Sequence, residues 1–146
     1  MTENQYQQRR SFNDRRDNSD DEIQKIVSEF RPTWITNGSD KDMISYTEKA
    51  GKFMKEKNLT SSKIRNVYGE IKRIQMAGYE KEKTSFYLLK PKMAYALGRD
   101  KNVKGLDLFK RLFDKCFDCV KDEKTYKNFC NFIEALIAYH RSFGGK

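Results

Sequence analysis

Residues that support common kinds of catalysis are scarce in this 146-residue sequence. The chain has one histidine, two prolines, one tryptophan and three cysteines, and its eight glycines are scattered. No nucleophile has an evident base close by in the sequence, and no Gly-rich loop is placed to hold a nucleotide phosphate. These gaps favour a protein that is not an enzyme.

The cysteines Cys116, Cys119 and Cys130 are too few and too unevenly spaced for a disulfide framework. Cys116 and Cys119 have the C-x-x-C spacing, but a closed zinc site needs four ligands and His140 is the one imidazole in the sequence. Cys116 lies on the apolar stripe of a predicted helix. We therefore interpret it as a small core residue.

Three carboxylates, Asp114, Asp118 and Asp122, recur at i, i+4 and i+8 and would align on one side of a helix. Lysines and an arginine are interspersed with them, as on a solvated helix face. Hard cations need more convergent oxygen ligands than one such face provides. We predict no metal site here.

Long apolar runs are also missing. None approaches the ~20 residues that a membrane span requires, and residues 1–20 lack the apolar core of a signal peptide. We expect no membrane segment, no membrane partner and a cytoplasmic location.

Apolar residues recur at helical spacing along most of the chain, and no window alternates with a period of two. We predict an all-α fold, a single bundle of about five to six helices over residues 20–146. Residues 1–19 are polar and are expected to form a disordered tail. Charged residues make up 35% of the sequence, so the core must come from the ten phenylalanines and the aliphatic residues.

Helix boundaries can be placed from capping residues and prolines. A first helix should end before Pro32, and Trp34 should lie in a connector. The next helix should begin after Ser39 or Asp40, with Ile44 among its inward residues. The other expected helices are 60–78, 80–99 with a kink or break before Pro91, about 106–120, and 126–143.

Positive charge is concentrated in residues 49–104. This stretch holds 15 Lys or Arg and 5 Asp or Glu, a net charge of +10, whereas the whole chain carries +9. A concentrated positive charge on a small helical protein favours a polyanionic partner such as nucleic acid.

Two helical stripes within this stretch combine cations with a tyrosine, at the spacing i, i+3, i+7. Each offers two cations for phosphates and one ring for sugar or base contact. The alternative is that the tyrosines are half-buried packing residues. The predicted RNA-binding residues are Arg65, Tyr68 and Lys72, then Lys92, Tyr95 and Arg99, with Lys63 and Arg73 beside the first stripe and Lys52 and Lys90 widening the basic field.

Two polar residues near the C-terminus have structural interpretations. Glu134 interrupts an apolar run, so we predict a structural ion pair with Arg99 or Arg65. His140 is expected on the surface near a helix end.

Three sequence blocks resemble one known family. They read LTSSKIRNVYGEI at 59–71, LLKPKMAYALGR at 88–99 and FCNFIEALIAYH at 129–140. In this order and spacing they resemble the small subunit of the type III-A CRISPR interference (Csm) ribonucleoprotein complex, over roughly residues 40–145.

The resemblance implies a small helical bundle without cofactor or catalytic activity. Several copies would stack head to tail as a minor filament along the guide RNA–target RNA duplex, beside the backbone and large subunits of the complex. The basic positions that match the family are Lys63, Arg65, Lys90, Lys92 and Arg99. Residues 1–19 have no counterpart, so their role stays open.

Two other functions stay open on the sequence alone. One is a stand-alone helical DNA-binding regulator, for which the loop at 57–59 would join a helix-turn-helix pair. The other is a protein–protein adaptor whose positive charge meets an acidic partner.

Overall fold

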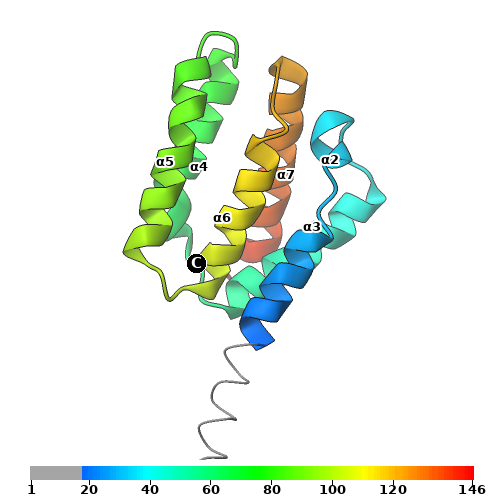
Figure 1. Cartoon of the computed structure of the whole chain (residues 1–146), viewed down its shortest axis with the longest axis vertical. Coiled ribbons are helices and arrows are strands. Elements are labelled where there is room, and N and C mark those ends of the chain that lie inside the picture. The colour runs from blue at the N-terminus through cyan, green and yellow to red at the C-terminus, as the bar shows by residue number, and fades with distance from the viewer. Residues whose placement is uncertain (1–17) are drawn as a thin grey trace, which may run out of the picture.

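The computed structural model describes residues 18–146, and within this range the chain forms helices and no strands. The all-α prediction is therefore confirmed. No helix in this part is long and apolar enough to cross a bilayer. The helices are residues 18–28, α2 (Thr33–Thr36), α3 (Lys41–Glu56), α4 (Ser61–Ala77), α5 (Lys83–Arg99), α6 (Lys104–Phe117) and α7 (Glu123–Ser142) (Figure 1).

Helix α7 lies at the centre of the bundle, where it packs against α2, α3, α4 and α6, while α5 packs against α4 and α6. Aromatic side chains form two clusters along α7. One surrounds Phe132 and includes Phe30, Trp34 and Tyr46. The other contains Tyr79, Phe86, Phe113, Phe117, Tyr126 and Phe129. Burying one such ring contributes about 1.5–3 kcal/mol, so these clusters account for much of the stability.

Local capping explains where several helices begin and end. The Asp40 carboxylate accepts a hydrogen bond from the Met43 backbone N–H at 2.8 Å, which starts α3 as predicted. Gly78 follows α4 with a φ of 105°, a conformation that glycine adopts without strain. Asp122 and Thr125 form a capping box at the start of α7.

Several expected details were wrong. The connector after Pro32 contains the one-turn helix α2, which buries Trp34 and Ile35. Ile44 is exposed, because α3 turns other residues inward. The first helix includes residues 18 and 19, which we had assigned to the tail. The rest of that predicted tail, residues 1–17, lies outside the described residues.

A kink or break was predicted before Pro91; the break does not occur, since α5 runs from Lys83 to Arg99 with Pro91 inside it. Proline lacks an N–H, so the carbonyl of Tyr87 loses its helical partner. Both residues are exposed, and water can hydrogen-bond that carbonyl. Buried Leu89 and Met93 on either side hold α5 against the core and offset the cost of the proline.

His140 was expected on the surface but is buried. Its Nε2 lies 2.6 Å from the backbone carbonyl of Leu59, in the loop between α3 and α4. In the same loop, the backbone carbonyl of Lys57 accepts a hydrogen bond from the Gly105 N–H at the start of α6. The ends of α3 and α7 and the start of α6 therefore fix the first turn of α4 in place, and α4 carries half of the candidate site.

Candidate nucleic-acid interface

Helices α4 and α5 lie side by side as an antiparallel pair at one side of the bundle (Figure 1). Each turns its apolar stripe inward: Ile64, Val67, Ile71 and Ile74 on α4, and Phe86, Leu89 and Met93 on α5. Arg73 of α4 holds the connecting loop by binding Glu82 at 3.1 Å. The two helices therefore border a shared groove with a fixed spacing, just outside this apolar layer.

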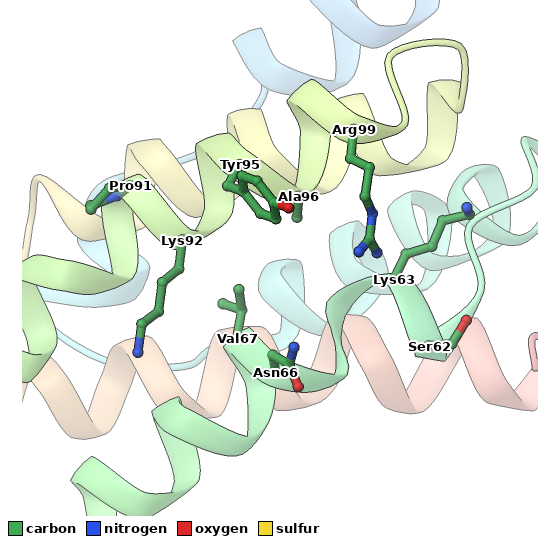
Figure 2. Close-up of a pocket in the computed structure, with 9 residues that line it drawn as sticks. All are labelled: Ser62, Lys63, Asn66, Val67, Pro91, Lys92, Tyr95, Ala96 and Arg99. Carbon is green, nitrogen blue, oxygen red and sulfur yellow. The ribbon is translucent and has the colours of Figure 1, made fainter.

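The groove has a volume of about 490 Å³ and is lined by both helices. Helix α4 supplies Ser62, Lys63, Asn66 and Val67, and α5 supplies Pro91, Lys92, Tyr95, Ala96 and Arg99. Figure 2 shows the Lys92 and Arg99 side chains extending from α5 towards α4. Four of the ten predicted RNA-binding residues, namely Lys63, Lys92, Tyr95 and Arg99, thus meet at one site.

The groove has more positive than negative charge. Asp100, just after α5, lies 3.2 Å from the Lys63 ammonium and 3.6 Å from Arg99 Nε. Lys92 has no ion-pair partner among residues 18–146. Three cations therefore line the groove, and two of them share the carboxylate of Asp100, which leaves a site suited to an anion.

The other predicted stripe, Arg65, Tyr68 and Lys72, does not line this groove. It runs along another side of α4, next to α7, where Lys72 lies 3.3 Å from Glu134. The Lys72 ammonium also lies 5.3 Å from the centre of the Tyr68 ring. Hydrogen bonding to Tyr68 and then to Glu134 raises the pKa of Lys72. Arg65 is exposed and makes no ion pair within the described part of the chain.

Glu134 does form an ion pair, but the expected partner was wrong. It pairs with Lys72 rather than with Arg99 or Arg65. Its side chain is 55% exposed, so it is not the costly buried carboxylate that the apolar run suggested. An exposed pair of this kind contributes little to stability, about 0–1 kcal/mol.

The remaining predicted residues lie outside the groove. Arg73 binds Glu70 at 2.6 Å as well as Glu82, which neutralises its charge. Lys90 lies 3.4 Å from Asp118 and over the ring of Phe117, towards α6. Lys52 is on α3 and lines a separate hollow near Phe143.

Sequence reasoning missed two polar residues of the groove, Ser62 and Asn66, and the counter-ion Asp100. A signal for Asn66 was present, because it falls three positions after Lys63 and so shares its side of α4. No such spacing connects Asp100 with Lys63. That contact depends on how α4 and α5 pack.

The residues considered for metal or thiol chemistry have structural surroundings. Asp114 pairs with Lys110 at 2.6 Å, while Asp122 caps α7. Residues 18–146 contain no cluster of three or more His, Cys, Asp or Glu that could hold a metal ion. Burial raises the pKa of Cys116 well above its usual range and that of Cys130 to about 12, which disfavours a reactive thiolate.

Fold and surface together define a small, basic, all-helical protein whose exposed groove carries cations and an aromatic ring. A family model described as Csm2 Type III-A matches residues 38–146, most of the chain. The chain belongs to this family, a small-subunit family of the type III-A CRISPR system, which confirms the resemblance of the three sequence blocks.

One curated relative is the CRISPR system Cms protein Csm2 of Streptococcus thermophilus. It is 36% identical to this chain over 58 residues, which cover 40% of this chain and 47% of that protein. The match thus spans about half the length of the relative. No solved structure matches the chain.

Proposed function

We propose that this protein is the non-catalytic small subunit of a type III-A CRISPR effector complex and that it binds the sugar-phosphate backbone of RNA. Copies of the chain form a minor filament along the guide RNA–target RNA duplex in the cytoplasm, next to the backbone and large subunits. Family membership supports the place in the complex. The groove between α4 and α5 supports the RNA contact, and it is the observation that carries the proposal.

Backbone contacts are sufficient for this function. Base pairing with the guide supplies the sequence specificity, and the narrow major groove of an A-form helix hides its base edges from side chains. Such a subunit needs cations held at fixed spacing and has no need of a recognition helix. Lys92 and Arg99 meet this requirement, since they are two turns apart on α5 and both extend towards α4 (Figure 2).

A charge-reversal experiment tests the proposal. The double variant Lys92→Glu plus Arg99→Glu should bind an RNA duplex at least tenfold more weakly in a filter-binding or anisotropy assay. Loss of two phosphate contacts gives a change of this size, about 1.4 kcal/mol or more. The matched control is Lys124→Glu plus Lys127→Glu, which makes the same change in net charge at exposed positions on α7.

The outcomes separate the functions that the sequence left open. Weak binding by the groove variant together with wild-type binding by the control supports the proposal. Equal losses in both variants would mean that net charge matters and the groove does not. Sequence-specific binding of duplex DNA would favour the regulator. Failure to bind any nucleic acid at low salt, with a protein partner still bound, would favour the adaptor.

Membership of the complex has its own test. A tagged chain purified from its native host should retain short guide RNAs and several protein partners. Recovery of the protein alone, free of RNA, would contradict the proposed place in the complex.

A further inference from the structure

Part of the groove between α4 and α5 is not required for contact with phosphates alone. Tyr95 is 71% exposed although it lines the groove, so its ring is available for contact. Tyr126, by contrast, is buried in an aromatic cluster. An A-form duplex keeps its bases stacked inside, so phosphate contact alone requires cations and no free aromatic face.

The residues around Tyr95 provide the other surfaces that a nucleobase needs. Pro91 and Ala96 form an apolar wall beside the buried Val67, whose side chain is directed towards α5 (Figure 2). Asn66 contributes an amide that can both donate and accept hydrogen bonds. A base edge presents the same mixture of donors and acceptors.

The rim of the groove determines the charge of the ligand. Lys63, Lys92 and Arg99 outnumber Asp100, so an anion is favoured, while the ring and the apolar wall favour a flat, apolar part. A nucleotide combines both properties. The volume of about 490 Å³ lies within the range of about 300–1,000 Å³ typical of small-ligand pockets.

We propose that this groove binds one unpaired nucleotide of an RNA strand, with its base stacked on Tyr95. Asn66 contacts the base edge, and Lys92 and Arg99 contact the adjoining phosphates. The inference rests on the proposed RNA-binding function and adds to it a preference for a strand in which one base is free of its partner. Stacking on an aromatic side chain tolerates any base, so the preference is for an unpaired base and not for a sequence.

The test compares three RNA hairpins with the full-length chain. One is perfectly paired, one carries a single bulged 2-aminopurine nucleotide, and one carries an abasic ribose at the same bulge. The last two have the same backbone and the same number of phosphates, so a difference between them reports the base alone. The bulged base should bind about tenfold more tightly than the abasic bulge, and its fluorescence should fall on binding because the base stacks.

Two tyrosine variants locate the effect. Tyr95→Ala should abolish the tenfold preference and the loss of fluorescence, while binding to the paired hairpin persists. Tyr87→Ala is the matched control, because this exposed tyrosine is on the same helix but does not line the groove. Circular dichroism checks that both variants are folded.

Each result has a clear meaning. Equal affinity for the hairpin with the bulged base and the hairpin with the abasic bulge would overturn the inference and leave backbone binding intact. Loss of the preference in Tyr87→Ala instead would place the base elsewhere on α5 and also overturn it. Binding of free AMP as tightly as the bulged hairpin would overturn the assignment to an RNA strand. Failure of all three hairpins to bind would contradict the proposed function itself.

Discussion

At the scale of single residues, Arg73 shows how a cation of the basic stretch acts in the fold. Its guanidinium donates hydrogen bonds to Glu70 on α4 and to Glu82 and Ser85 at the start of α5. These hydrogen bonds lower the pKa of both carboxyl groups. Arg73 therefore links α4 to the start of α5, and its charge is already balanced by two carboxylates.

Replacing Arg73 should change the pH dependence of stability. A carboxyl group whose folded pKa is lowered contributes stability above its unfolded pKa, near 4.5, and this contribution is lost as the pH falls through the folded pKa. Arg73→Ala should therefore lower Tm slightly at pH 7, since the groups are exposed and screened. The difference from wild type should shrink below about pH 4.5.

Thermal unfolding between pH 7 and pH 3 measures this effect. Arg65→Ala is the control, because Arg65 is exposed on the same helix without an ion pair in the described residues. A difference between wild type and Arg73→Ala that stayed constant over the whole pH range would show that the carboxylates are not involved.

The burial and contacts of single side chains were the features hardest to predict from the sequence. Glu134 and His140 both lie on α7, six positions apart, yet Glu134 is exposed and His140 is buried. Helical spacing gives the direction of each side chain relative to its neighbours. It does not reveal that the loop carrying Leu59 covers His140, because that contact joins residues 81 positions apart.

At the scale of helices, local signals predicted most boundaries. The caps at Asp40 and Gly78 and the apolar stripes of α6 and α7 follow from the sequence. The helix does not break at Pro91, because proline's local preference is outweighed by the burial of Leu89 and Met93. The groove was predicted in part: the spacing on α5 gave Lys92, Tyr95 and Arg99, but which side of α4 faces them depends on tertiary packing.

Two glycines on neighbouring helices should respond in opposite ways to alanine. A Cβ atom on Gly51 of α3 would lie 2.7 Å from the Cβ of Tyr139 and 2.9 Å from the backbone N of His140. Gly51→Ala should therefore force α3 and α7 apart and cost about 1–3 kcal/mol. A Cβ on Gly69 of α4 would meet nothing within 4 Å, so Gly69→Ala should gain about 0.5–1 kcal/mol of helix stability.

Urea unfolding of the two variants measures both changes. The pair controls for the loss of glycine flexibility, which is the same in each. A stabilising effect of Gly51→Ala would contradict the close approach of α3 and α7. Destabilisation by Gly69→Ala would mean that the outer side of α4 is constrained in a way that the structure does not show.

At the scale of the whole molecule, the basic stretch of residues 49–104 does not act as one uniform surface. Pairing with acidic side chains reduces the effective charge of Lys63, Lys72, Arg73 and Lys90. The value of +10 already subtracts Glu70, Glu82 and Asp100, but not Glu134 and Asp118, which lie outside this stretch. The charge available to a polyanion is therefore smaller than +10 suggests. Within the described residues, the exposed cations without an ion pair include Lys92 in the groove and Arg65 on another side of α4, while Arg99 shares Asp100 with Lys63.

This distribution predicts how affinity for RNA depends on salt. Each phosphate contact contributes about 0.7–0.9 to the slope of log Kd against log salt concentration. Two or three groove cations should thus weaken binding of an RNA hairpin about 10- to 40-fold between about 50 and about 200 mM salt. Two hairpins of equal length and unrelated sequence should give the same slope and nearly the same Kd, because phosphates carry no sequence information.

The groove variant Lys92→Glu plus Arg99→Glu should show a shallower slope, while Lys124→Glu plus Lys127→Glu should keep the wild-type slope. A slope much steeper than three groove cations allow would require further phosphate contacts, with Arg65 and Lys52 as the next exposed cations to test. A Kd that differed strongly between the two hairpins at every salt concentration would contradict backbone recognition. In that case the protein would recognise bases directly. Base pairing with the guide would then not be the sole source of sequence specificity, as the proposed function requires.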